Sequence, residues 1–121
     1  MENNREEQID ALEVFTDFNE RLIKNMNIIV RELSGARLDD TDKFLKSIVD
    51  AINWEIQVVN GTMDLLNEGK ERVHKEEVNN VIVSLSNAIT EKNDAKMAEE
   101  FKKAIPVFEQ LGESVKEVIK D

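Results

Sequence analysis

The sequence predicts an all-α protein, an up-down four-helix bundle formed by a single domain over residues 1–121. Apolar residues recur every three or four positions along most of the chain, which is the period of an amphipathic helix. The chain has 4 glycines and 1 proline, so few positions interrupt a helix. Hydrophobic residues make up 40% and charged residues 35%, a balance that is typical of folded helical domains and too apolar for a disordered chain.

The first predicted helix covers about residues 4–34. Its buried face is predicted from apolar positions that keep the helical period without a break: Ile9, Leu12, Phe15, Phe18, Leu22, Met26, Ile29 and Leu33. Gly35 follows as the predicted end of this helix, because glycine adopts the left-handed conformation after a helix at low energetic cost.

The second predicted helix covers about residues 41–68 and carries more apolar surface than one helix face can use. Asp39, Asp40 and Thr41 offer side-chain oxygens for its N-cap, and Gly69 is its predicted stop. Its main face carries Leu45, Ile48, Val49, Ile52, Ile56, Val59, Met63 and Leu66. A second ridge carries Phe44, Ala51, Val58 and Leu65, flanked by Trp54 and Gly61. The rest of the chain, a second copy or a partner must cover this ridge.

The third predicted helix covers about residues 75–92, and the fourth covers about residues 94–120 after an N-cap at Asn93 or Asp94. The third helix is predicted to bury Val78, Val81, Ile82, Leu85, Ala88 and Ile89. The fourth is predicted to bury Met97, Phe101, Ala104 or Ile105, Phe108, Leu111, Val115, and Val118 or Ile119. Pro106 predicts a kink on the outer side of the fourth helix, and Gly112 on its buried face predicts close approach of another helix.

The predicted helices differ in length, which bears on what the bundle covers. At about 1.5 Å per residue, the first, second and third helices are roughly 46, 42 and 27 Å long. We expect the short third helix to leave the tip of the first hairpin exposed, including Ile28, Phe44 and Ile48. A three-helix bundle with a displaced or broken fourth helix is the alternative fold.

The formal net charge of −10 at pH 7 predicts an acidic surface that repels phosphate backbones and anionic lipid headgroups. No apolar run approaches the roughly 18 residues that a membrane span needs. The polar N-terminus lacks the features of a signal peptide, and the absence of cysteine excludes disulfides and thiolate metal sites. We therefore expect a cytoplasmic protein without nucleic-acid or membrane partners.

The sequence offers no specific catalytic or metal-binding motif. His74 is the only histidine, and Glu71 precedes it in a single Glu-x-x-His, whereas a di-iron carboxylate bundle needs two such motifs and further inward-facing glutamates. No acidic residue interrupts the predicted apolar stripes, so we expect those partners to be missing. The four glycines stand singly, which is unlike a phosphate-binding loop. We expect no catalytic residue, no metal and no cofactor, and a carboxylate-metal enzyme that uses Glu71 and His74 is the remote alternative.

The surplus apolar surface on the first two helices favours a non-enzymatic protein-binding module, chaperone-like or an adaptor. The candidate partner-binding residues are Ile28, Phe44, Ile48, Trp54, Val58, Gly61 and Leu65. Trp54, Val58, Gly61 and Leu65 form one ridge at helical spacing, and Asn53, Gln57 and Asn60 line its polar rim. The alternative is a homodimeric structural protein in which a second copy covers the same apolar residues. No motif is specific enough to name a family.

Overall fold

The computed structural model describes residues 2–120, with side chains described for residues 5–120. All of the regular structure in this part of the chain is helical, which confirms the all-α prediction. The helices are α1 (Glu2–Leu33), α2 (Thr41–Gly61), α3 (Met63–Leu66), α4 (Lys75–Glu91) and α5 (Asp94–Ile119). The predicted starts at residues 41, 75 and 94 are confirmed, because apolar period and helix-start residues are local properties of the sequence.

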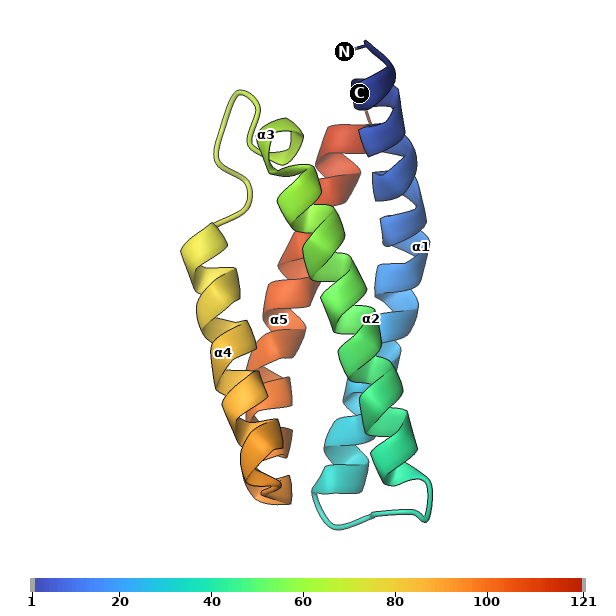
Figure 1. Ribbon diagram of the computed structural model, residues 1–121, viewed down its shortest axis with the longest axis vertical. Coiled ribbons are helices and arrows are strands. Elements are labelled where there is room, and N and C mark those ends of the chain that lie inside the picture. The colour runs from blue at the N-terminus through green and yellow to red at the C-terminus, as the bar shows by residue number, and fades with distance from the viewer. Residues whose placement is uncertain (1, 121) are drawn as a thin grey trace.

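Four long helices pack together, and α1 and α5 form the most extensive pair. In Figure 1, α1 and α4 run downward while α2 and α5 run upward. Helix α2 packs on α1, α4 packs on α5, and the short α3 contacts α5 near its C-terminal end. Among the described residues, α2 and α4 have no contact of comparable extent. The arrangement is therefore a central α1–α5 pair with one flanking helix on each member.

The core lies along the central pair, where Phe15, Phe101 and Phe108 are completely buried. The predicted stripe of α1 is buried at most positions, but Phe18 is only half-buried and the neighbouring Asn19 is 3% exposed. Asn19 occupies this position because its side-chain amide donates a hydrogen bond to the Phe108 carbonyl oxygen at 3.1 Å. A polar side chain can be buried where its donor finds a partner.

Gly112 permits the close approach of α1 and α5, as its position on the buried face predicted. A Cβ atom added at Gly112 would lie 2.5 Å from Nδ2 of Asn19, the atom that donates to Phe108.

Helix α5 continues through Pro106, whose side chain is exposed. Asn93 caps α5 as predicted, because its side-chain oxygen accepts a hydrogen bond from the Lys96 backbone amide.

The predicted second helix is divided at Thr62, so the prediction of one helix over residues 41–68 is wrong at this point. Thr62 has φ −120° and ψ 13°, and its backbone amide bonds to the Val59 carbonyl oxygen. Its hydroxyl also donates to the Val58 carbonyl oxygen at 2.7 Å. A threonine hydroxyl that satisfies a carbonyl of the preceding turn stabilises an interruption here. The following short helix α3 ends before Gly69, which has φ +83°.

The tip of the first hairpin is partly covered, whereas the helix lengths predict an exposed tip. A linker over residues 67–74 places α4 lower along α5 than direct succession would, so the turn between α4 and α5 reaches the tip (Figure 1). Arg37 in the α1–α2 loop bonds Asp94 at the start of α5, with Nε and Oδ2 2.8 Å apart. Ile48 is consequently 1% exposed and Ile28 and Phe44 are half-buried, while Leu38 in the loop stays exposed.

The linker is held by its own side chains. Oδ1 of Asn67 accepts hydrogen bonds from the backbone amides of Arg72 and Val73, each at 2.9 Å. The Arg72 guanidinium donates to the carbonyl oxygens of Leu66 and Glu68. Buried Val73 anchors the same segment in the core.

At the start of α2, Asp40 makes no side-chain capping bond, which corrects the prediction of a cap there. The Thr41 hydroxyl instead accepts a hydrogen bond from the Leu38 backbone amide.

The contact between Asn19 and Gly112 gives a test of how closely α1 approaches α5. We expect Gly112→Ala to destabilise the wild type and to stabilise an Asn19→Ala background. In the wild type the new methyl group displaces a buried amide and breaks its hydrogen bond, whereas in the second background only the better helix propensity of alanine remains. The two effects of Gly112→Ala on the free energy of unfolding should differ by about 1–3 kcal/mol.

Urea unfolding of the wild type, Gly112→Ala, Asn19→Ala and the double variant measures this difference. Gly61→Ala is the control, because a Cβ atom at Gly61 meets no atom within 4 Å. It should leave stability unchanged or raise it slightly in both backgrounds. Equal effects of Gly112→Ala with and without the Asn19 side chain would show that the amide does not limit the approach of the helices.

Candidate functional site

A groove between α2 and α4 is the candidate site. The first of its two hollows has a volume of about 60 Å³. The hollow is lined by Val49, Ile52, Asn53, Ile82, Leu85, Ser86 and Ile89. Ile52 and Leu85 form the buried floor, and Val49, Ile82 and Ile89 are half-buried along the walls. The hollow exists because α2 is held by α1 and α4 is held by α5, so the two flanking helices do not close on each other.

A second hollow extends the groove toward the α1–α2 loop. It has a volume of about 410 Å³ and shares Ile89 with the first hollow. Its lining consists of Arg37, Asp42, Leu45, Ile89, Lys92 and Met97. The apolar groove therefore ends in a charged region at the loop.

The charges at that end are tied to one another. The Arg37 guanidinium bonds Asp94 and also Asp42, where Nη1 and Oδ1 are 2.9 Å apart. The hydrogen bond to Asp94 and, to a smaller extent, the one to Asp42 raise the pKa of Arg37 above its usual value. In return, the bond from Arg37 lowers the pKa of Asp94. These groups fix the loop against α5 and mark where the uncharged part of the groove stops.

None of the residues that line the first hollow is charged. The sequence from Val78 to Thr90 contains thirteen consecutive residues without a charge, in a chain whose charged content is 35%. Its exposed members are Asn79, Asn80, Val83, Ser84, Ser86, Asn87 and Thr90. On the opposite rim, α2 exposes Asp50, Asn53, Gln57 and Asn60, of which only Asp50 is charged. An apolar floor with depletion of charged residues around it is the composition of a protein–protein interface.

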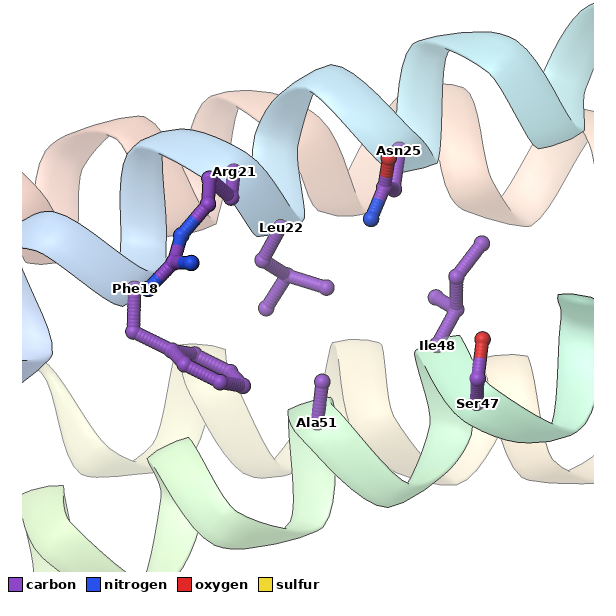
Figure 2. A pocket seen from close by; sticks show the side chains of 7 residues that line it. All are labelled: Phe18, Arg21, Leu22, Asn25, Ser47, Ile48 and Ala51. Carbon is purple, nitrogen blue, oxygen red and sulfur yellow. The ribbon is translucent and has the colours of Figure 1, made fainter.

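The predicted ridge on α2 lies on the other side of that helix, next to α1. Figure 2 shows the cleft there, with Phe18 and Arg21 on α1 facing Ala51 on α2. The Phe18 ring packs on Trp54 with ring centroids 4.9 Å apart, and the Arg21 guanidinium lies 5.9 Å from the Phe18 centroid. The cleft has a volume of about 180 Å³. The chain itself therefore supplies an aromatic neighbour for Trp54.

The candidate partner-binding residues fall into three groups. Ile48 and Leu65 are 1% and 5% exposed, so they belong to the core, and Ile48 also lines the cleft between α1 and α2. The half-buried residues are Ile28, Phe44, Trp54 and Val58. Gly61 is exposed with no neighbour at its Cβ position, so it is not a notch for another helix. The structure does not bring these residues into the groove, whereas it does place Asn53 there.

Glu55 is a buried carboxyl group that corrects the expectation of uninterrupted apolar stripes. It is 0% exposed, and neither of its side-chain oxygens has a hydrogen-bond partner among the described residues. Burial without a partner raises the pKa of Glu55 to about 8. The sequence contained the necessary signal, because buried Ile52 and Val59 lie three positions before and four positions after it on the same helix face.

Other features of the described residues give no support for metal chemistry. Glu71 and His74 are exposed and form a side-chain hydrogen bond with Oε1 and Nδ1 2.8 Å apart. The described part of the chain contains no group of three or more His, Cys, Asp or Glu residues that could hold a metal ion.

None of the described helices has the length and apolar character that crossing a membrane requires.

Glu55 gives a pH-dependent prediction. The unfolded carboxyl group ionises near 4.5, whereas the folded one keeps its proton to about pH 8. Between these values the folded state binds more protons, so stability is greatest at the acidic end and falls as pH rises. We expect the free energy of unfolding to fall by about 1 kcal/mol per pH unit in this window, and Glu55→Gln to remove that slope.

Urea unfolding at several pH values across the window measures the slope. Glu113→Gln, a substitution of an exposed carboxyl group on α5, should retain the wild-type slope. The same slope in Glu55→Gln and in wild type would mean that Glu55 is not the group responsible.

Comparison with known proteins identifies one family. The family described as a domain of unknown function (DUF8042) matches residues 10–114. This range contains all of α2, α3 and α4 and most of α1 and α5. No curated protein and no solved structure matches the chain. Because the matched range covers most of the 121 residues, the chain belongs to the DUF8042 family.

Proposed function

We propose that this protein is a non-enzymatic binding module, an adaptor or chaperone-like protein, that receives an apolar helix face of another polypeptide in the groove between α2 and α4. The observation that carries the proposal is the combination of an apolar floor with uncharged lining residues from both helices. A helix that docks there buries Val49, Ile82 and Ile89, and no residue that lines the hollow brings a charge into the interface.

The mode of binding follows from the shape of the site. A groove between two neighbouring helices accepts a third helix whose side chains enter between theirs. The exposed amides of Asn53, Gln57 and Asn60 supply donors and acceptors that can pair with polar residues at the edge of the docked helix. The apolar floor supplies affinity, and the amide rim supplies orientation.

The proposal also covers the arrangement of the helices, a bend in α5 and the cellular location of the protein. It takes the chain as an up-down four-helix bundle in which α5 bends at Pro106, because proline removes one backbone donor and its ring presses on the preceding turn. It also takes the protein as cytoplasmic, in keeping with its acidic and cysteine-free composition. The ridge of Phe44, Trp54 and Val58 is assigned to packing within the chain, since Phe18 lies against Trp54.

Two exposed serines on α4 provide a matched test. Ser86 lines the groove, whereas Ser84 lies about 160° away around the helix and does not line it. We expect Ser86→Arg to reduce capture of binding partners at least about tenfold, because a long cation at the rim blocks entry and would have to be desolvated. Ser84→Arg should capture at the wild-type level.

The measurement is affinity capture on tagged protein from an extract of the native cells, with the captured polypeptides, including untagged copies of this chain, quantified by mass spectrometry. Arginine has a higher helix propensity than serine, so neither variant is expected to lose its fold, and circular dichroism checks this. Equal capture by the Ser86→Arg and Ser84→Arg proteins would exclude the groove as the binding site.

A further inference from the structure

We infer that the occupant of the groove is α4 of a second copy of this chain, in a two-fold dimer where each copy inserts the outer edge of its α4 between α2 and α4 of the other. The inference rests on the proposed function in using the groove as a binding site, and it adds the identity of the occupant. Three properties of the described residues lead to it: the charge distribution, the side chains along the edge of α4, and the exposure of Val83.

The charge distribution favours a second copy over a basic partner. With a net charge of −10, two copies repel each other over most of their surfaces. The thirteen-residue uncharged segment of α4 is the longest in the chain, so it offers the place where two copies meet with least repulsion. A basic partner would instead be recognised by acidic side chains, and none of the residues that line the first hollow is acidic.

The edge of α4 that borders the groove is itself suited to enter one. Asn79, Val83, Ser86 and Thr90 follow one another at spacings of four, three and four residues, so they form a single ridge along the helix. All four side chains are exposed and none is charged. A ridge of this kind packs between the helices of a groove, and a two-fold axis makes the two insertions identical.

Val83 lies near the centre of this ridge and is 57% exposed, which is among the largest exposures of an apolar residue in the described chain. Asn79 and Ser86 flank it on the same edge, and their side chains both donate and accept hydrogen bonds. Such groups can pair with their own symmetry mates, which a row of like charges cannot do. In the dimer, Val83 of each copy enters the apolar groove formed by Val49, Ile82 and Ile89 of the other.

A pair of valines tests the inference. Val14 on α1 is also 57% exposed, so Val83→Glu and Val14→Glu make the same change at the same exposure on different helices. We expect the wild type and Val14→Glu to have the mass of a dimer, twice 13.9 kDa, and Val83→Glu to have that of a monomer. A buried carboxylate on each side of a two-fold axis should raise the dissociation constant by about 100-fold or more.

Sedimentation equilibrium and light scattering over about 1 µM to 1 mM protein measure the mass, since this range spans the dissociation constants of weak to moderate dimers. Circular dichroism establishes that both variants remain helical. Because the chain has no cysteine, single substitutions Ser86→Cys and Ser84→Cys give a second measurement with a short thiol cross-linker. Ser86→Cys should yield covalent dimer, and Ser84→Cys should yield little.

A wild-type protein that stays monomeric throughout this range would overturn the inference. So would a dimer that persists in Val83→Glu or cross-links equally through residues 84 and 86. The proposed function fails separately, on equal partner capture by the Ser86→Arg and Ser84→Arg proteins. A monomer whose capture of other proteins is sensitive to Ser86→Arg would therefore reject the second copy as occupant and retain the groove as a binding site.

Discussion

The packing of α1 against α5 is the constraint on which the other contacts depend. Phe15, Phe101 and Phe108 are completely buried along this pair, and Gly112 allows Asn19 to reach the backbone of the opposing helix. Each flanking helix is then held by a different member of the pair, α2 by α1 and α4 by α5. Since neither flanking helix needs the other for its attachment, the two remain apart, and the groove between them is a direct consequence.

Local sequence signals predict the helices well and their interruptions less well. The starts at residues 41, 75 and 94 follow from apolar period and from polar residues that precede each helix. The break at Thr62 could not be predicted, because Val59, Met63 and Leu66 keep the helical period across it. The height of α4 along α5 depends on bonds that Asn67 and Arg72 make within the linker, and helix lengths alone misjudge which surface is covered.

The components of the candidate site differ in how far they could be read from the sequence. The burial of Glu55 is predictable from the sequence, because its neighbours at helical spacing are apolar. The amides of Asn53, Gln57 and Asn60 are recognisable in the sequence as a polar rim. The groove itself cannot be predicted from the sequence, because it depends on the separation of α2 from α4 and not on either helix alone. The ridge around Trp54 was visible in the sequence, but the aromatic partner Phe18 was assigned to the core stripe of α1.

Occupation of the groove and stability of the bundle are physically linked. Burial of the unpaired Glu55 carboxyl group makes the folded state less stable as pH rises toward 8. Helix α4 adds only three buried side chains to the core, those of Val78, Leu85 and Ala88, and it is attached mainly through α5. A polypeptide that binds only the folded protein and covers Val49, Ile82 and Ile89 stabilises the fold by mass action, in proportion to the logarithm of its concentration above its dissociation constant. The flanking helices, which have the fewest internal contacts to hold them, are therefore the ones that gain most from a bound helix.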